Sequence, residues 1–448
     1  MEASSHNVSI GVEEEAISDS WVMEMDKMIG DSDRSSEMKQ WSKRYIYRVP
    51  AWIKNLHPDR HPKKCNAYSP QLMSLGPFHH GVSDLVSMEV HKHRAVAHLV
   101  RRSGKQLSEF TAAVRSVADQ LWDAYEDIGA EWEGERFVKL MVTDGCFLLE
   151  LLMMGEAEGN MPEDYPPMDP VFSKHGYLNL WDTLWCDMIV MENQLPLLLL
   201  HTLVTIHRGT SPTAKEINHL VCDALFSTEE DTQLDQDQGL HILDIYHKVY
   251  LCCNADNVPR QGSDRHEDMP SAVELYQAGI HFKGLENLNL AGIHFERGVL
   301  YMPVIKFYDN IECEFLNVMA FERLHPNAGN HVMDFVYFMD NLIDTAADVR
   351  LLCSNRVIVN LLGSDEELAT LINKILSKQV GLSDNTPIHD VHRQVSDHCK
   401  KPWNKWRATF IHTYFSNPWV FISLIAAVIL LVATIMQTVY TIIPFYRK

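Results

Sequence analysis

The sequence is short of positive charge and of the motifs that mark common enzyme classes. It holds 39 Lys and Arg against 60 Asp and Glu, a net charge of −21. Proteins that bind nucleic acid by neutralising phosphates usually carry a basic patch, so this balance argues against nucleic-acid binding. No GxSxG nucleophile elbow, Walker lysine loop, GxGxxG or HExxH is present. The sequence therefore predicts no catalytic, cofactor-binding or metal-binding residues and no cofactor.

Cysteine pairs of the metal-binding or redox type are also missing. Nine cysteines, an odd number, lie between Cys65 and Cys399, and none forms CxxC. Most of them, such as Cys146 and Cys222, lie in apolar stretches, which is typical of buried, reduced thiols. Reduced cysteines agree with a folded body that lies in the cytosol.

No secretory signal is recognisable, because the first thirty residues hold no basic segment followed by an apolar run. Residues 1–40 carry ten Asp or Glu against three Lys or Arg, without a sustained apolar period. We therefore expect residues 1–40 to form an acidic, disordered lead-in.

Against these absences, one long apolar run dominates the sequence. The 21 residues from Val420 to Tyr440 carry no charge, and a helix of that length spans about 30 Å, the thickness of a bilayer hydrocarbon core. Trp419 and Tyr440 flank the run, as aromatic residues do at membrane interfaces. We expect Val420–Tyr440 to contact the lipid bilayer as a single transmembrane helix, with 441–448 as a short tail.

The basic residues around this run predict its orientation. Four precede it, Lys400, Lys401, Lys405 and Arg407, and two follow it, Arg447 and Lys448. This bias predicts a cytosolic N-terminal body and a tail-anchored protein of the plasma membrane or an endomembrane. A glycan on the sequon at Asn7 would reverse the orientation.

Residues 41–415 have the composition of a folded body with a large core. Apolar residues recur at helical spacing through 108–129, where Ser108 is the expected N-cap. The stretches 136–155 and 184–207 are almost wholly apolar and are expected to be buried helices, the second broken at Pro196.

The second half of the body mixes helices with short strands. Residues 271–284 and 319–352 are expected to be helical, whereas the runs between about 290 and 310 predict strands. Ser364 opens a capping box ahead of an apolar stripe. The expected fold class is mainly α: a helical globular body with a few short strands, plus one C-terminal transmembrane helix.

Two polar stretches, 227–239 and 254–270, lack a core pattern and predict internal linkers. The first contains Asp235 and Asp237, whose alternation resembles a calcium loop. The glycine comes one place late and no Glu closes the loop, so we expect no calcium site.

One group of potential zinc ligands recurs every four residues, at His57, His61 and Cys65. Pro58 and Pro62 follow the two histidines and exclude a regular helix there. No second ligand pair lies nearby, so no metal site is predicted.

Two other groups are candidates for an unfamiliar active site. His79 and His80 lie in a turn and are expected to be structural. Asp187 and Glu192 are five residues apart, so a helix would place them on different faces. The favoured interpretation is that residues 192–194 hydrogen-bond the backbone where Pro196 breaks the helix. The alternative is an enzyme, for example a hydrolase, whose two segments converge in a pocket.

An ordered series of short motifs resembles the plant family of domain of unknown function 247. The motifs are Tyr45–Pro50, Ala67–Pro70, Ser74–Gly81, Met88-Glu89, His91-Lys92, Asp144–Phe147, Glu192–Pro196, Ser271-Ala272, Glu274-Leu275, Ala278-Gly279, Asn317, Ala320–Glu322, Tyr414-Phe415 and Asn417–Trp419. The resemblance covers about Trp41 to Tyr440. It departs at HPDRHPKKC, which looks like an insertion, and at Leu316 and Arg323, where Arg and Gln are commoner.

The resemblance implies a single-span membrane-associated plant protein without an assigned catalytic residue. Some grass members of the family are associated with pollen self-recognition, which implies recognition or signalling. We therefore expect a non-enzymatic, membrane-anchored protein that binds a protein partner, and homo-oligomerisation is left open. A pore or transport subunit is disfavoured by a lone span without an intramembrane charge.

Overall fold

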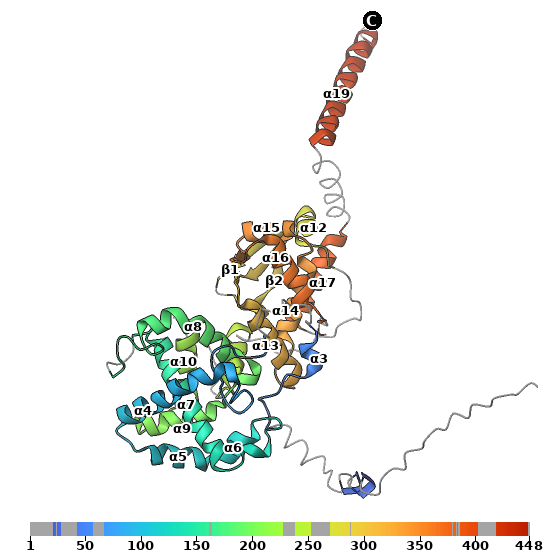
Figure 1. The fold of residues 1–448 in the computed structure, drawn as a ribbon. Helices are drawn as coiled ribbons and strands as arrows, with labels where there is room; N and C mark the ends of the chain where they lie inside the picture. The colour runs from blue at the N-terminus through green and yellow to red at the C-terminus, as the bar shows by residue number, and fades with distance from the viewer. Residues whose placement is uncertain are drawn as a thin grey trace, which may run out of the picture.

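A computed structural model (Figure 1) describes most of the chain. The described residues are 21–23, 25–27, 43–56, 67–160, 164–226, 238–251, 269–401 except 287, 379, 382, 384 and 385, and 418–446. The zinc-ligand candidates His57, His61 and Cys65 lie outside them, as do Asp235, Asp237 and most of residues 1–40 and of the two predicted linkers.

The first part of the body consists of helices. They are α3 (Ala51–Lys54), η1 (Ser83–Met88), α4 (Glu89–Ser103), α5 (Leu107–Ser116), α6 (Ala118–Asp123), η2 (Ala130–Trp132), α7 (Glu135–Glu156), α8 (Lys174–Ile189), η3 (Met191–Asn193), α9 (Leu197–Arg208), α10 (Ala214–Phe226) and α11 (Ile242–Leu251). Helix α7 is buried along most of its length and packs against α4, α5, α9 and α10. The predicted buried helix at 136–155 is therefore confirmed.

The helix expected at 108–129 is shorter and divided. Helix α5 begins at Leu107, and Gln106 forms the capping box with Glu109, so Ser108 is not the cap. Val117 leaves the helical region before α6 begins, and α6 ends at Asp123 rather than near Gly129. The capping side chain and the break at Val117 are local features that the apolar spacing does not report.

A break interrupts the helix predicted over 184–207, but it begins at Val190 and only ends at Pro196. Helix α8 ends at Ile189, and the chain turns through η3 before α9 begins at Leu197. The stretches Lys174–Ile189 and Met191–Arg208 are bent by 101° relative to each other. Pro196 precedes the first residue of α9, where a missing N–H costs no helical hydrogen bond.

The second part of the body combines helices with two small sheets. Its elements are α12 (Ala272–Gln277), β1 (His281–Leu285), η4 (Leu290–Gly292), β2 (His294–Glu296), β3 (Val299–Pro303), β4 (Ile305–Phe307), α13 (Ile311–Leu324), α14 (His331–Leu342), α15 (Ala346–Ser354), β5 (Ile358–Asn360), α16 (Asp365–Thr370), the π-helical η5 (Leu371–Leu376) and α17 (Pro387–Lys400). Strand β3 pairs in parallel with β1 and antiparallel with β2, and β4 pairs in parallel with β5.

These elements confirm the strands expected between 290 and 310 and correct one helix. The helix predicted over 271–284 ends at Gln277, because Gly279 has φ +97° and the chain then enters β1. Ser364 caps α16 as predicted, with its hydroxyl accepting from the Glu367 N–H at 3.0 Å. The stripe behind it, including Leu368 and Ile372, is buried.

A single cluster of buried apolar side chains runs through both parts of the body, from Ile46 to Val395. Helices α4 to α10 surround one end of it and α12 to α17 the other (Figure 1). Helix α13 lies between the two groups and contacts both α8 and α14. The fold is mainly helical, as the sequence predicts.

The C-terminal helix α19 spans Pro418–Tyr446 and is drawn apart from the body (Figure 1). The apolar stretch Ile422–Val439 within it is long enough to cross a membrane, and none of it is buried against the rest of the chain. The helix continues past Tyr440, so residues 441–446 of the expected tail are helical. Continuation adds no exposed polar backbone, because each further turn satisfies its own carbonyls.

Candidate functional site

Backbone N–H groups of the segment 67–76 hydrogen-bond to buried side chains of the body, and Asp187 accepts three of these hydrogen bonds. The Asp187 carboxylate accepts hydrogen bonds from the backbone N–H groups of Gln71, Leu72 and Met73 at 2.7, 2.8 and 2.8 Å. The side chain is fully buried. Burial raises the pKa of Asp187 to about 6, although the three N–H donors favour the ionised form.

Asn193 and Gln194 satisfy the backbone around the helix break. Asn193 accepts from the Leu75 N–H at 2.6 Å and donates to the Met73 carbonyl at 3.1 Å and the Asp187 carbonyl at 2.9 Å. Gln194 donates to two carbonyls of the break, at 2.7 Å each, and accepts from the Leu243 N–H at 3.1 Å. These contacts agree with the structural interpretation of residues 192–194.

Glu192 connects the same break to the N-terminal segment. Its carboxylate accepts from the Val49 N–H at 2.7 Å and pairs with the Lys54 ammonium at 2.6 Å. His79 Nε2 lies 3.1 Å from the other carboxylate oxygen. Burial acts to raise the pKa of Glu192, but contacts with His79 and Lys54 outweigh it and the pKa is lowered.

A buried lysine completes this polar network. Lys92 is fully buried and its ammonium lies 2.8 Å from Asp144, 2.7 Å from Glu89 and 3.1 Å from the Ser74 hydroxyl. Burial alone would lower the pKa of Lys92, but the two carboxylates raise it, so the ion pair is retained. The other Asp144 oxygen accepts from the Gly76 N–H at 2.9 Å.

Gly76 is required at its position for two reasons. Its φ of +72° lies in the left-handed region, and a Cβ atom there would come within 2.8 Å of the Tyr125 hydroxyl. That hydroxyl donates to the Gln194 carbonyl at 3.0 Å. The turn that contains His79 and His80 is therefore fixed against the helix break.

The two segments of the enzyme hypothesis thus converge, through His79 and Glu192. The Glu192 and Asp187 carboxylates are committed to backbone N–H groups and to Lys54. The His80 ring packs edge-on against Trp132 at 5.2 Å between ring centroids, and its buried Nδ1 has no hydrogen-bond partner among the described residues. Neither of the two cavities described below is lined by these residues. The arrangement ties segments 45–81 and 187–196 together, and the two segments line neither cavity.

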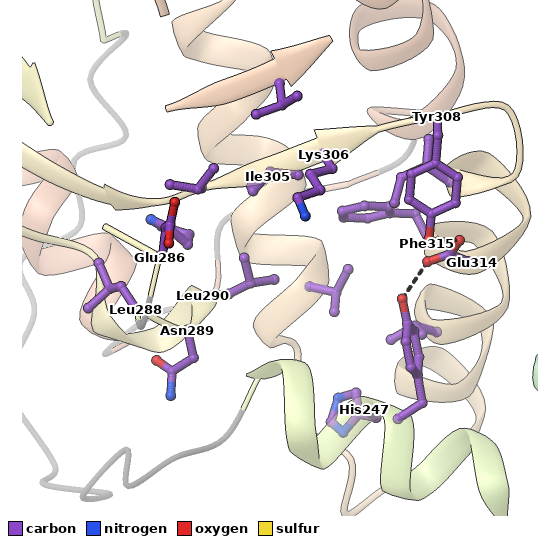
Figure 2. Close-up of a pocket in the computed structure, with 17 residues that line it drawn as sticks. His247, Glu286, Leu288, Asn289, Leu290, Ile305, Lys306, Tyr308, Glu314 and Phe315 are labelled. Carbon is purple, nitrogen blue, oxygen red and sulfur yellow. Dashed lines mark hydrogen bonds between the residues drawn. The ribbon is translucent and has the colours of Figure 1, made fainter. Parts of the chain in front are cut away.

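A cavity of about 490 Å³ lies elsewhere, between α11, β4 and α13 (Figure 2). Its walls are mostly apolar, and they include Leu288, Leu290, Ile305, Phe315, Val318 and Val332. No sequence motif points to it, because its residues come from separate elements between 246 and 359. An apolar cavity of this size with a few polar groups is the usual form of a small-molecule site.

Glu314 is the most deeply buried acidic group of the cavity. The Tyr246 hydroxyl donates to one carboxylate oxygen at 2.5 Å, and the Tyr308 hydroxyl donates to the other (Figure 2). Burial raises the pKa of Glu314 to about 7, opposed by the two tyrosines. Beside it, His247 Nε2 lies 2.9 Å from Glu322, which also accepts from two backbone N–H groups of α14.

Lys306 is the cationic side chain of this cavity. It is exposed on β4, and its ammonium points into the cavity (Figure 2). Within the described part of the chain the structure gives its ammonium no hydrogen bond and no ion pair. A second, more open cavity of about 980 Å³ shares Glu286, Leu288, Val304 and Val359 with the first, and Arg356 lines it.

Neither a metal-ligand cluster nor a disulfide is seen among the described residues. Among the described residues, no three His, Cys, Asp or Glu side chains come together in a way that could hold a metal ion. Six cysteines are described, and none of the six forms a disulfide. For Cys146, Cys186 and Cys222, burial raises the thiol pKa, as expected for inert thiols of a protein core.

The fold and these contacts define a mainly helical protein whose sequence motifs meet in one buried polar network. A family described as "Plant protein of unknown function", DUF247, matches residues 46–433. The chain belongs to this family. A UPF0481 protein of Arabidopsis thaliana is 26% identical over 89% of this chain and 86% of its own length. A putative UPF0481 protein of the same plant is 22% identical over 93% of each chain. No solved structure matches the chain.

Glu314 should make the stability of the body depend on pH. Its pKa is about 7 in the folded state against 4.5 ordinarily, so the unfolded state loses the proton first as pH rises. Stability is therefore expected to fall between pH 4.5 and pH 7, by about 3 kcal/mol in all. Glu314→Gln removes this titration. Urea unfolding of both proteins from pH 4 to pH 8 should show wild type losing about 3 kcal/mol relative to the variant.

Glu366, which is exposed on α16, provides the matched control. The free energy of unfolding of Glu366→Gln should follow that of wild type in parallel from pH 4 to pH 8. A Glu314→Gln curve that also runs parallel to wild type would show that Glu314 titrates normally in the folded protein.

Proposed function

We propose that this plant protein is held at a membrane by α19 and that its folded body, on the cytosolic side, acts by binding a protein partner in recognition or signalling. The membrane is the plasma membrane or an endomembrane. The observation that carries the proposal is the exposed apolar surface of α19, of which the stretch Ile422–Val439 is not buried by the body at all. An isolated helix with this much apolar surface is stable in lipid and not in water.

The contrast with the other apolar helices supports this assignment. Helices α7 and α9 are also rich in apolar residues, but their side chains are packed in the core. Leu430 and Leu431 of α19 are exposed by more than half. Their burial has to come from outside the described body, and a bilayer provides it over the whole circumference of the helix.

A row of exposed valines supports the binding of a protein partner. Val82, which immediately precedes η1, Val86 in η1 and Val90 in α4 are 43%, 49% and 64% exposed. Apolar residues exposed together on the surface are a common feature of sites that contact another protein chain. The network described above fixes the position of this valine row, because Glu89 lies between Val86 and Val90, and Lys92 follows Val90 by two residues.

The experiment is proximity labelling from the N-terminus of the full-length protein in intact plant cells. Wild type is compared with the triple variant Val82→Ser, Val86→Ser, Val90→Ser. We expect the variant to lose at least one cytosolic neighbour by tenfold or more, since the apolar contact area is removed.

The matched control is Leu178→Ser, which removes a 70% exposed leucine from α8. It should keep the wild-type set of neighbours, and both variants should stay in the membrane fraction. Identical neighbours for wild type and triple variant would remove the valine row from the proposal, and lumenal neighbours would reverse the orientation.

A further inference from the structure

We infer that the cavity between α11, β4 and α13 binds a small amphiphilic carboxylate, with its apolar body inside the cavity and its carboxylate on Lys306. This site is independent of the membrane anchor and of the valine row, because it shares no residue with either. It is therefore tested separately from the proposed function.

The walls determine the apolar part of the ligand. Side chains from η4, β4, α13 and α14 face the same space, among them Leu290, Ile305, Phe315 and Val332 (Figure 2). Contact of the apolar walls with water is unfavourable, and an apolar ligand body removes that contact. The volume of about 490 Å³ lies within the range of small-molecule sites.

The polar groups at the α13 end are already satisfied. Both carboxylate oxygens of Glu314 accept from tyrosine hydroxyls, Tyr246 and Tyr308. His247 is paired with Glu322. This end of the cavity therefore offers no free anion to a cationic ligand, and it favours a neutral, apolar end of the ligand.

Lys306 determines the charged part. Its ammonium points into the cavity and has no partner among the described residues (Figure 2). A carboxylate placed there gains a charge-assisted hydrogen bond next to an apolar wall, where water screens the pair less than it does in bulk. A lysine ammonium suits a single carboxylate as a compact point charge.

Glu286 limits where the anion can lie. It is exposed at the edge that the first cavity shares with the second. Its negative charge opposes a carboxylate at that edge, so the geometry points to the Lys306 end as the anion position. Replacing Glu286 by Gln should leave carboxylate binding unchanged or strengthen it.

The test uses full-length protein in lipid nanodiscs, with empty nanodiscs as the blank. The probes are 4-phenylbutyrate and its neutral counterpart 4-phenylbutanamide, and binding is measured by isothermal titration calorimetry. We expect the carboxylate to bind wild type at least tenfold more tightly than the amide. Lys306→Gln should weaken the carboxylate at least tenfold and leave the amide unchanged, whereas Glu286→Gln should not weaken either.

Val318→Phe fills the cavity from α13 and should abolish binding of both probes while Lys306 is intact. Because Lys306 is exposed, Lys306→Gln is expected to fold even where the filled-cavity variant does not. Equal affinities for acid and amide, an unaffected Lys306→Gln variant, or no binding of either probe to wild type would each overturn the inference.

Discussion

Asp187→Ala is expected to destabilise the body by about 3–5 kcal/mol. One fully buried carboxylate accepts from three backbone N–H groups, those of Gln71, Leu72 and Met73, at 2.7 to 2.8 Å. Alanine leaves these donors unpaired, and each buried donor without a partner costs about 1–3 kcal/mol. Partial access of water to residues 71 and 72 keeps the total below the sum of three full penalties.

The measurement is urea unfolding of the full-length protein in detergent, followed by tryptophan fluorescence. Asp182→Ala is the matched control, because Asp182 is exposed on the same helix, α8. It should change the free energy of unfolding by less than about 0.5 kcal/mol. The free energy of unfolding of Asp187→Asn should lie between those of Asp187→Ala and Asp182→Ala. The asparagine amide keeps one acceptor oxygen, but its NH₂ group places donors opposite backbone N–H groups. Equal stabilities for Asp187→Ala and Asp182→Ala would show that the three hydrogen bonds are not formed.

This prediction bears on what the family motifs do. Motif residues from Tyr45–Gly81, Asp144–Phe147 and Glu192–Pro196 meet in one buried network. Asn317 joins α13 to it by accepting from the Met191 N–H at 2.9 Å and donating to the Ala67 carbonyl at 2.7 Å. Side chains in such networks specify one arrangement of the backbone. The motifs therefore mark a fold, and a shared motif does not by itself indicate a shared reaction.

Deletion of residues 418–448 is expected to move the protein completely from the membrane fraction to the soluble fraction. Twelve Leu, Ile, Val and Phe side chains lie between Val420 and Tyr440. At about 0.3–0.6 kcal/mol each near the centre of a helix, they favour insertion by about 4–7 kcal/mol, before the smaller cost of the polar residues. Fractionation by ultracentrifugation checks this result.

The truncated protein should also stay folded. Because the stretch Ile422–Val439 is not buried by the body, its removal should leave the urea midpoint unchanged. An unrelated transmembrane helix fused in its place should return the body to the membrane fraction. A truncated protein that still sediments with membranes would mean that another part of the chain attaches it.

The elements that the sequence predicts well are those determined by local pattern. Helix α7 follows from its apolar run, and the start of α9 follows from Pro196, which immediately precedes it. Strands β1 and β5 were missed because their stability comes from pairing with distant residues. Ile305 of β4, for example, pairs with Ile358 of β5. Strands of three to five residues carry too little periodicity to be identified alone.

In the candidate sites, too, the sequence predicts the local contacts and misses the contacts between distant residues. The sequence indicates that residues 192–194 serve the backbone near Pro196, because amide and carboxylate side chains suit a helix break. It does not reveal that the N–H groups of Gln71 to Met73 are the partners of Asp187, because side chain and backbone are more than 110 residues apart. The cavity is harder still, since Tyr246, Lys306 and Glu314 come from three separate elements and form no motif.

The measurement that tests the central claim most directly is alkaline carbonate extraction of the intact protein from plant membranes. A protein whose helix α19 crosses the bilayer resists this treatment, because its apolar surface stays in lipid when surface charges are changed. We predict that the full-length protein remains in the membrane pellet. Release into the supernatant would contradict a spanning α19 and, with it, a body held at the membrane.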